Sequence, residues 1–245
     1  KKVVDLILDT YKDFGIKDYR FVLSLRDPED KEKYHQDDEM WEKAENGLRE
    51  VLKELGINYT EEIGEAAFYG PKLDVNVRPA VGNEYTLSTC QLDFCLPAKF
   101  DLKYVDKDGS KKTPVVLHRA ILGSIDRFMA YILEETKGNL PLWLSPVQVN
   151  IIPVNNEYHL EYCNKLHEKL LDENIRVELD NRDEKLSYKI RESQTHKIPF
   201  TLIIGQNEVD NNLISYRKFG TTETVTISID ELIILLKKAI KNKEL

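Results

Sequence analysis

The stretch PVVLHRAILGSIDRF at residues 114–128 decides how the first half of the chain is organised. Its apolar start, 114–117, has the composition of a strand, and apolar side chains then recur every three or four residues. This periodicity predicts a helix over 119–137 that ends at Gly138. His118 stands at the junction, where an isolated histidine is a metal ligand or, more commonly, a hydrogen-bonded structural residue.

One face of the expected helix carries small side chains followed by an arginine. Small residues let a flat ligand approach the helix backbone, and a guanidinium can neutralise a phosphate through charge-assisted hydrogen bonds. The pattern is typical of a nucleotide site, but a close contact between packed elements beside a surface salt bridge produces it more often. The residues are Ala120, Gly123, Ser124 and Arg127, spaced i, i+3, i+4 and i+7.

Before this stretch, the pattern predicts two amphipathic helices and a series of strands. The helices cover 3–14 and 41–55. From 68 to 117 apolar and polar residues alternate around an Asp108-Gly109 turn, which indicates an antiparallel meander. The expected strands of this half lie at 19–26, 73–77, 87–94, 100–105 and 114–117.

Two groups of polar residues in the meander could carry chemistry. The tight Gly70-Pro71 bend can aim Tyr69 and Lys72 at one point, although such a bend is most often only a turn that enters a strand. In the strand 87–94, alternation places three polar residues on one face, which a bound ligand or an internal hydrogen-bond network must satisfy. These three residues are Thr89, Gln91 and Asp93.

The second half of the chain predicts a separate, smaller domain. The segment 138–146 interrupts the helical pattern with Pro141 and Pro146 and is the expected boundary. After it, strands and helices alternate, which predicts a small α/β domain around a mixed sheet. We therefore expect an α+β domain over 1–140 and an α/β domain over 145–245.

Composition excludes several classes of protein. The chain has 245 residues, a formal net charge of −8, 41% hydrophobic and 32% charged residues, as expected of a soluble globular protein. The longest apolar runs, 128–133 and 232–236, are far shorter than the ~18 residues of a membrane-spanning helix. Net acidity argues against a general nucleic-acid coat but allows a local basic site. The cysteines are odd in number and lack CxxC spacing, which indicates reduced thiols in the cytoplasm: Cys90, Cys95 and Cys163.

Several segments together, in this order, resemble class II threonyl-tRNA synthetases. Each short string alone is a weak signal, but their joint occurrence covers practically the whole chain. The strings are FYGPKLDV at 68–75, STCQLDF at 88–94, LPAKFDLKY at 96–104, PVVLHRAILGSIDRF at 114–128, LPLWLSPVQV at 140–149 and DEKLSYKIRE at 183–192.

The resemblance implies a fold and an activity. The first part would belong to a class II catalytic domain built on an antiparallel sheet, and the second would be an anticodon-binding domain. The parent enzyme would activate threonine with ATP and Mg²⁺, transfer it to tRNA(Thr), and act in the cytoplasm as a homodimer. A noncatalytic tRNA-binding paralogue is the alternative from another class, and a prolyl or histidyl relative is an alternative with a different substrate.

The resemblance also implies roles for particular residues. Arg127 would contact the ATP phosphates, with Gly123 and Ser124 leaving room for the nucleotide. Thr89 and Gln91 would hydrogen-bond the adenylate or its ribose, while Tyr69 and Lys72 would line the threonine and α-phosphate side. His118 would be one of three ligands to a Zn²⁺ that selects threonine by coordinating its hydroxyl group.

In the smaller domain, the resemblance implies that Glu208 and Arg217 contact the anticodon. The segment 182–197 carries five basic residues against three acidic ones and is locally basic in an acidic chain. Some of these cations are expected to contact phosphates and others to lie at helix ends. At Asp183 the bacterial enzymes of the family more often carry asparagine, so a base contact there is doubtful.

Parts of the family pattern are missing from this sequence. Motif 1, motif 2 with its arginine, the editing domain, and a cysteine and a histidine that complete the zinc ligands are expected before residue 1. The isolated chain is therefore expected not to form threonyl adenylate efficiently. Threonine-dependent ATP–pyrophosphate exchange measures this directly, and appreciable exchange by the isolated chain would refute the expectation.

Overall fold

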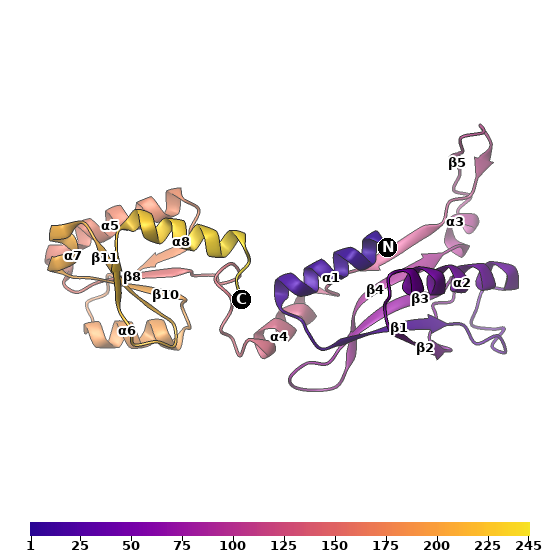
Figure 1. Ribbon diagram of the computed structural model, residues 1–245, viewed down its shortest axis with the longest axis horizontal. Coiled ribbons are helices and arrows are strands. Elements are labelled where there is room, and N and C mark those ends of the chain that lie inside the picture. Colours follow the sequence, from indigo (N-terminus) through magenta and orange to yellow (C-terminus); the bar gives the residue numbers. More distant parts are fainter. The chain divides into compact units, whose positions relative to one another are not determined.

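The computed structural model describes residues 1–245 and divides into two compact units, 1–135 and 136–245 (Figure 1). Each unit has its own five-stranded sheet. None of the helices is both long enough and apolar enough to cross a membrane. All three cysteines are buried free thiols.

The sheet of the first unit has the strand order β2-β1-β3-β4-β7. Its pairs are antiparallel except for β1 and β2, which run parallel. The antiparallel meander predicted within 68–117 is confirmed for β3, β4 and β7, and the parallel pair involves β2, which was not anticipated. The strands are β1 (Tyr19–Leu25), β2 (Tyr59–Ile63), β3 (Lys72–Val77), β4 (Tyr85–Asp93) and β7 (Val116–Ala120).

Two amphipathic helices of this unit form where the sequence predicts them. Helix α1 (Lys2–Phe14) buries one apolar face and ends at Gly15, whose φ of 70° is the left-handed conformation that glycine adopts without strain. Helix α2 (Asp38–Glu54) begins at the Asp37 cap, whose side chain accepts from the Met40 N–H. The Tyr11 hydroxyl of α1 shares a hydrogen bond of 2.7 Å with Ser88, so α1 covers one face of the sheet.

The helix expected over 119–137 is shorter than its apolar spacing suggested. Strand β7 continues to Ala120, which pairs with Thr89, and helix α4 spans only Ile125–Glu135. Gly123 adopts a φ of +65° between the two, which no helical residue does. Ile125, one of the apolar residues whose spacing predicted the longer helix, is 82% exposed. The predicted helical face of small residues is therefore wrong, because its members belong to a strand, a turn and a helix.

The strand expected over 100–105 is also mostly absent. Residues Cys95–Lys99 form the short helix α3, and only β5 (Tyr104–Val105) remains extended, paired with β6 (Lys111–Lys112). Gly109 forms the predicted turn of this hairpin with a φ of +78°. The N–H groups of the first two residues of α3 donate to the carboxylate of Asp93, the last residue of strand β4.

The second unit has the mixed sheet that the sequence predicts, with the order β12-β11-β10-β8-β9. Strands β8, β9 and β10 are mutually parallel, and β11 and β12 add antiparallel pairs. The strands are β8 (Val149–Pro153), β9 (Val177–Leu179), β10 (Phe200–Ile204), β11 (Ile214–Lys218) and β12 (Val225–Ile227).

Helices cover both faces of this second sheet, and the faces differ in character (Figure 1). Helices α5 (Asn156–Asp172) and α8 (Ile229–Lys241) pack on an apolar face that forms the core. Helix α6 (Leu186–Thr195) lies on the opposite face, where Ser193 shares a buried hydrogen bond of 2.6 Å with Thr201. A fourth helix, α7 (Gln206–Asn211), follows β10. The polar groups of this unit therefore gather on the α6 face.

Gly70 offers a test of the first unit's packing. A Cβ atom at this position would lie 1.9 Å from the Leu92 carbonyl oxygen of β4, whereas one at Gly47 of α2 would meet nothing within 4 Å. We expect Gly70→Ala to lower the free energy of unfolding by about 1–3 kcal/mol, because backbone must move to make room. Gly47→Ala should raise it by up to about 1 kcal/mol through helix propensity.

Urea denaturation can measure both changes through the fluorescence of Trp41, in a Trp143→Phe background. Because Trp41 is fully buried in the first unit, its signal reports on that unit. Equal stability of Gly70→Ala and the parent chain would contradict the close approach of Gly70 to β4.

Candidate functional site

Polar side chains from three neighbouring strands share one face of the first sheet. Lys72 lies opposite Gln91 and Asp74 lies opposite Thr89 across β3 and β4, while Gln91 also lies opposite His118 of β7. Directly opposed residues point to the same face of a sheet. The register therefore gathers these five side chains on the face opposite to that covered by α1.

Asp74 organises one end of this group. The residue is only 6% exposed, and its carboxylate accepts hydrogen bonds from Thr89 Oγ1 at 2.6 Å and Ser24 Oγ at 2.9 Å. Lys72 Nζ lies 3.1 Å from Asp74 Oδ2. A buried carboxylate is tolerated when such partners satisfy it, and in turn it holds the Lys72 and Thr89 side chains in place.

Gln91 connects that end of the group to the aromatic residue beyond the Gly70-Pro71 bend. Its side-chain oxygen accepts a hydrogen bond from the Tyr69 hydroxyl, and its Nε2 donates to Thr89 Oγ1 at 3.3 Å. Burial, with a smaller contribution from the nearby Asp93 carboxylate, raises the pKa of Tyr69. The phenol therefore stays protonated at neutral pH and acts as a hydrogen-bond donor.

His118 lies at the other end of the group. Its Nε2 is 2.8 Å from Asp93 Oδ2, and its ring centroid is 5.4 Å from that of Tyr69. Asp93 is fully buried, and its second oxygen accepts the N–H groups of Cys95 and Leu96 at 3.0 and 2.9 Å. The histidine ring is thus held between a buried carboxylate and an aromatic ring.

The three residues at 123–127 that are predicted to bind nucleotide lie at the other end of β4. The Arg127 guanidinium carbon is 5.4 Å from the ring centroid of Tyr85, the first residue of that strand. Ser124 Oγ accepts from the Arg127 N–H at 3.4 Å as the helix begins, and a Cβ at Gly123 would lie 3.4 Å from the Leu87 oxygen. At ~3.4 Å per residue, Tyr85 and Gln91 are roughly 20 Å apart along the strand.

The structure thus brings Tyr69, Lys72, Thr89, Gln91 and His118 together and places Arg127, Ser124 and Gly123 elsewhere on β4 and its connection to α4. The polar face of the strand is satisfied by an internal network, one of the two possibilities that the alternation left open. Sequence reasoning missed Asp74 and Ser24. The available signal was that Asp74 alternates with Lys72, so both share the face of Thr89.

The residues of the first unit supply only one part of a metal site. No group of three or more His, Cys, Asp or Glu side chains that could hold a metal occurs in the described chain. His118 alone, with Nε2 turned to Asp93, fits a single ligand position, whereas a structural or catalytic zinc needs at least three protein ligands. These residues therefore do not complete a zinc site by themselves.

In the second unit, Glu208 and Arg217 are connected through strand β11. Glu208 Oε1 accepts from Ser215 Oγ at 2.7 Å, and its Oε2 accepts from the Gly205 N–H at 2.9 Å. Burial raises the pKa of Glu208, but these hydrogen bonds outweigh burial and lower it overall. Arg217 lies two residues beyond Ser215 on the same face, and its Nε donates to Thr224 at 2.9 Å.

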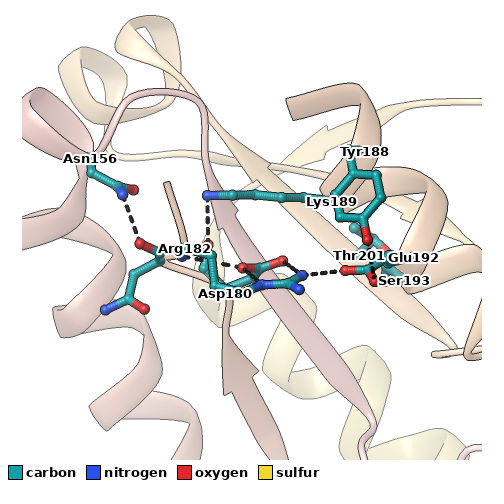
Figure 2. A network of polar contacts seen from close by, with 9 residues as sticks. Asn156, Asp180, Arg182, Tyr188, Lys189, Glu192, Ser193 and Thr201 are labelled. Atoms are coloured by element: carbon teal, nitrogen blue, oxygen red, sulfur yellow. Dashed lines mark hydrogen bonds and ion pairs between the residues drawn. The ribbon is translucent and has the colours of Figure 1, made fainter. Parts of the chain in front are cut away.

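Most of the locally basic segment 182–197 is engaged within the unit (Figure 2). Arg182 bonds to Asp180, at 2.7 Å from Oδ2, and also to Glu192, while Lys189 is 2% exposed and donates to the Asp180 carbonyl at 3.1 Å. Lys197 donates to the Lys137 carbonyl oxygen. Lys185 and Arg191 are exposed, as Arg182 is, but unlike Arg182 their side chains form no ion pair.

A cavity of about 260 Å³ lies beside this network, between β9 and α6. Its lining is polar and of mixed charge. The charged and polar residues around it are Asn150, Glu178, Asp180, Arg182, Glu192, Ser193 and His196. The loop that carries Asp183 leaves β9 at this cavity, and Asp183 itself is exposed.

Comparison with protein families matches both halves of the chain. The family model described as "tRNA synthetase class II core domain (G, H, P, S and T)" matches residues 1–136. The model described as "Anticodon binding domain" matches residues 148–239. The two matches fall on the two sheets in the order in which the chain presents them.

Individual proteins similar to this chain are threonine–tRNA ligases. The threonine–tRNA ligase of Staphylococcus carnosus is 54% identical over 244 residues, which is 100% of this chain and 38% of that protein. The threonine–tRNA ligase of Oceanobacillus iheyensis is 52% identical over the same share of each chain. A crystal structure of the RNA binding domain of threonyl-tRNA synthetase from Cryptosporidium parvum has a TM-score of 0.88 and 34% identity, covering 97% of this chain and 58% of that one. The chain thus spans about two fifths of the length of these curated relatives.

The buried carboxylate of Asp74 should contribute strongly to the stability of the first unit. Asp74→Ala removes the acceptor from Ser24 and Thr89 and leaves the Lys72 cation without its neighbour, so we expect the free energy of unfolding to fall by about 3 kcal/mol. Urea denaturation followed by Trp41 fluorescence measures the loss. As a matched control, Glu54→Ala removes an exposed partner of Lys1 and should cost less than about 0.5 kcal/mol. Similar losses in both variants would contradict a buried network.

Proposed function

The chain belongs to the class II tRNA synthetase family, and from that premise we propose that it works as part of a threonine–tRNA ligase. In this proposal the ligase activates threonine with ATP and Mg²⁺ and transfers it to tRNA(Thr). The observation that carries the proposal is the shared sheet face on which Lys72, Gln91 and His118 lie opposite one another. A noncatalytic module would have no use for an oriented cation and hydrogen-bonding groups held by buried carboxylates.

The polar face of the first unit supports a binding and orienting role in adenylate formation. Lys72 supplies positive charge toward the α-phosphate, and Asp74 keeps its ammonium group in position at 3.1 Å. Thr89 and Gln91 would hydrogen-bond the adenylate or its ribose, while Tyr69 would line the threonine side. Because the partners of these groups come from the sheet itself, little side-chain ordering remains to be done when substrate binds.

At the other end of β4, Arg127 would contact the ATP phosphates, and Gly123 and Ser124 would leave space for the nucleotide. Its guanidinium is exposed and rests on Tyr85, which restricts its movement without neutralising its charge. His118 would provide one ligand to a zinc ion, whose chemistry when bound is coordination of the amino and hydroxyl groups of threonine. The remaining ligands would have to come from outside this sequence.

The second unit would recognise the anticodon through Glu208 and Arg217. Ionised Glu208 can accept hydrogen bonds from base amino groups, and an arginine can read base edges or stack on them. The hydrogen bonds from Ser215 and Gly205 keep Glu208 ionised and fixed in direction. In this proposal the ligase works in the cytoplasm and as a homodimer.

Two variants should separate the roles of the two units in the full-length ligase. Gln91→Ala should lower kcat/KM for threonine-dependent ATP–pyrophosphate exchange about ten- to a hundredfold, because a hydrogen bond to a charged substrate is lost, and leave tRNA affinity unchanged. Glu208→Gln keeps an oxygen for the Gly205 N–H but presents a donor to the bases. It should raise the KM for tRNA about tenfold without changing exchange.

Each variant serves as the control for the other, because both assays are run on both proteins. An additional control is Glu223→Gln, an exposed glutamate before β12 that should change neither assay. Loss of exchange in Glu208→Gln, or of tRNA affinity in Gln91→Ala, would contradict the proposed division of roles.

A further inference from the structure

We infer that Asp93 is a positioning residue that fixes the tautomer of His118, placing its proton on Nε2 and leaving the Nδ1 lone pair as the ring's free acceptor. What Nδ1 then binds rests on the proposed function, in which His118 is a metal ligand. The tautomer itself rests only on the contacts of the folded chain.

The two oxygens of the Asp93 carboxylate have separate partners. Oδ1 accepts the backbone N–H groups of Cys95 and Leu96 at 3.0 and 2.9 Å, and Oδ2 faces Nε2 of His118 at 2.8 Å. An ionised carboxylate can only accept hydrogen bonds, so a neutral imidazole beside it must donate. The geometry therefore requires the neutral ring to carry its proton on Nε2.

The backbone keeps Asp93 in this position. It is the last residue of β4, opposite Val116, and its face of the strand is the face of Gln91 and His118. Helix α3 begins two residues after it, and the carboxylate that orients the histidine also accepts the N–H groups of the first two residues of that helix. Asp93 is fully buried, and no solvent competes for its oxygens.

The histidine ring is also restrained on its other side. Tyr69 lies with its ring centroid 5.4 Å away at an interplanar angle of 55°, and its hydroxyl is bonded to Gln91. With Nε2 bonded and the ring packed, the direction of the Nδ1 lone pair is set by the fold. Histidines that bind metals commonly donate their other ring N–H to a carboxylate, which fixes the tautomer in this way.

The double role of Asp93 makes Asp93→Asn a sharp test. The side-chain oxygen of asparagine must stay toward the two N–H groups of Cys95 and Leu96, because the opposite orientation would point amide hydrogens at two donors. The NH₂ group then faces Nε2 of His118, which has to accept. The proton of the neutral ring is therefore forced onto Nδ1, while the acceptor for the two N–H groups and the shape of the side chain are kept.

Long-range ¹H–¹⁵N NMR of the histidine rings observes the tautomer in the chain as it stands. With ¹⁵N-labelled histidine at alkaline pH, where the rings are neutral, the 5 histidines of the chain give 5 ring patterns. His118→Gln assigns the pattern of His118 by its disappearance. His159 provides an internal reference, because its Nδ1 accepts the Asn155 N–H at 3.1 Å and its neutral ring must therefore be protonated on Nε2.

We expect the parent chain to show His118 in the same tautomer as His159, and Asp93→Asn to show His118 alone switched to the Nδ1–H form. Because free histidine already favours the proton on Nε2, the switch in the variant is the decisive observation. Asp37→Asn is the matched control, since Asp37 caps a helix but its carboxylate bonds to a backbone N–H rather than to a histidine. It should leave the His118 pattern unchanged.

A His118 that remains protonated on Nε2 in Asp93→Asn, while the His159 pattern and the unfolding transition are those of the parent, would overturn the inference. A parent chain with His118 protonated on Nδ1 would overturn it as well. Should Asp93→Asn unfold the first unit, the parent chain still tests the inference, because a His118 ring protonated on Nδ1 there is incompatible with donation from Nε2 to Asp93.

Zinc analysis of the full-length ligase separates this inference from the proposed function. If His118 is a ligand, Asp93→Asn should weaken zinc binding about 10–100-fold. A switched tautomer with unchanged zinc affinity would refute the ligand role of His118 and leave the positioning role of Asp93 standing. An unswitched tautomer would refute the positioning role whatever the zinc content.

Discussion

Strand β4 is paired on both sides, and the registers of these two pairings set the position of the polar groups in the first unit. Gln91 stands opposite Lys72 on one side and opposite His118 on the other. Because side chains alternate with a period of two, a slip of one residue would send either partner to the opposite face. Tyr11 of α1, bonded to Ser88 near the middle of the strand, and the close approach of Gly70 to the Leu92 carbonyl near its end oppose such a slip.

Two buried carboxylates, at opposite ends of the group of polar residues, convert this register into fixed side-chain directions. Asp74 holds Thr89 and Lys72, and Asp93 holds His118. Burying a carboxylate is unfavourable unless its oxygens are satisfied, and here the partners that satisfy them are the residues proposed to meet the substrate. In the proposed function, stability and substrate orientation would therefore depend on the same hydrogen bonds, and variants at either aspartate would affect both.

The sequence predicts the parts of this arrangement that follow from local periodicity. Alternation places Thr89, Gln91 and Asp93 on one face, and strand–helix order predicts the mixed sheet of the second unit, both as found. Strand β2 was missed because it lies at the sheet edge with exposed residues and carries little apolar signal. The burial of Asp74 could not be predicted, since it depends on Ser24, which is 50 residues away in the chain.

The start of α4 was missed for a different reason. Apolar residues spaced three or four positions apart are typical of a helix, but a strand followed by a turn can produce the same spacing over a short stretch. Residues 116–125 do so. What distinguishes the two is the pairing of Ala120 with Thr89 and the positive φ of Gly123, and both are tertiary features.

In the second unit, the number of basic side chains in 182–197 overstates how many are available to bind nucleic acid. Counted from sequence, the segment 182–197 looks like a site for several phosphates, but Arg182 is bound to two carboxylates and Lys189 is buried. A cation that already has an anionic partner would have to release it before binding a phosphate, and this exchange gains little free energy. Only Lys185 and Arg191 of this segment stand exposed in positions that require no such exchange. The segment therefore acts mainly as a scaffold of the second unit, and in the proposed function tRNA discrimination would depend on base contacts by Glu208 and Arg217 rather than on phosphate attraction.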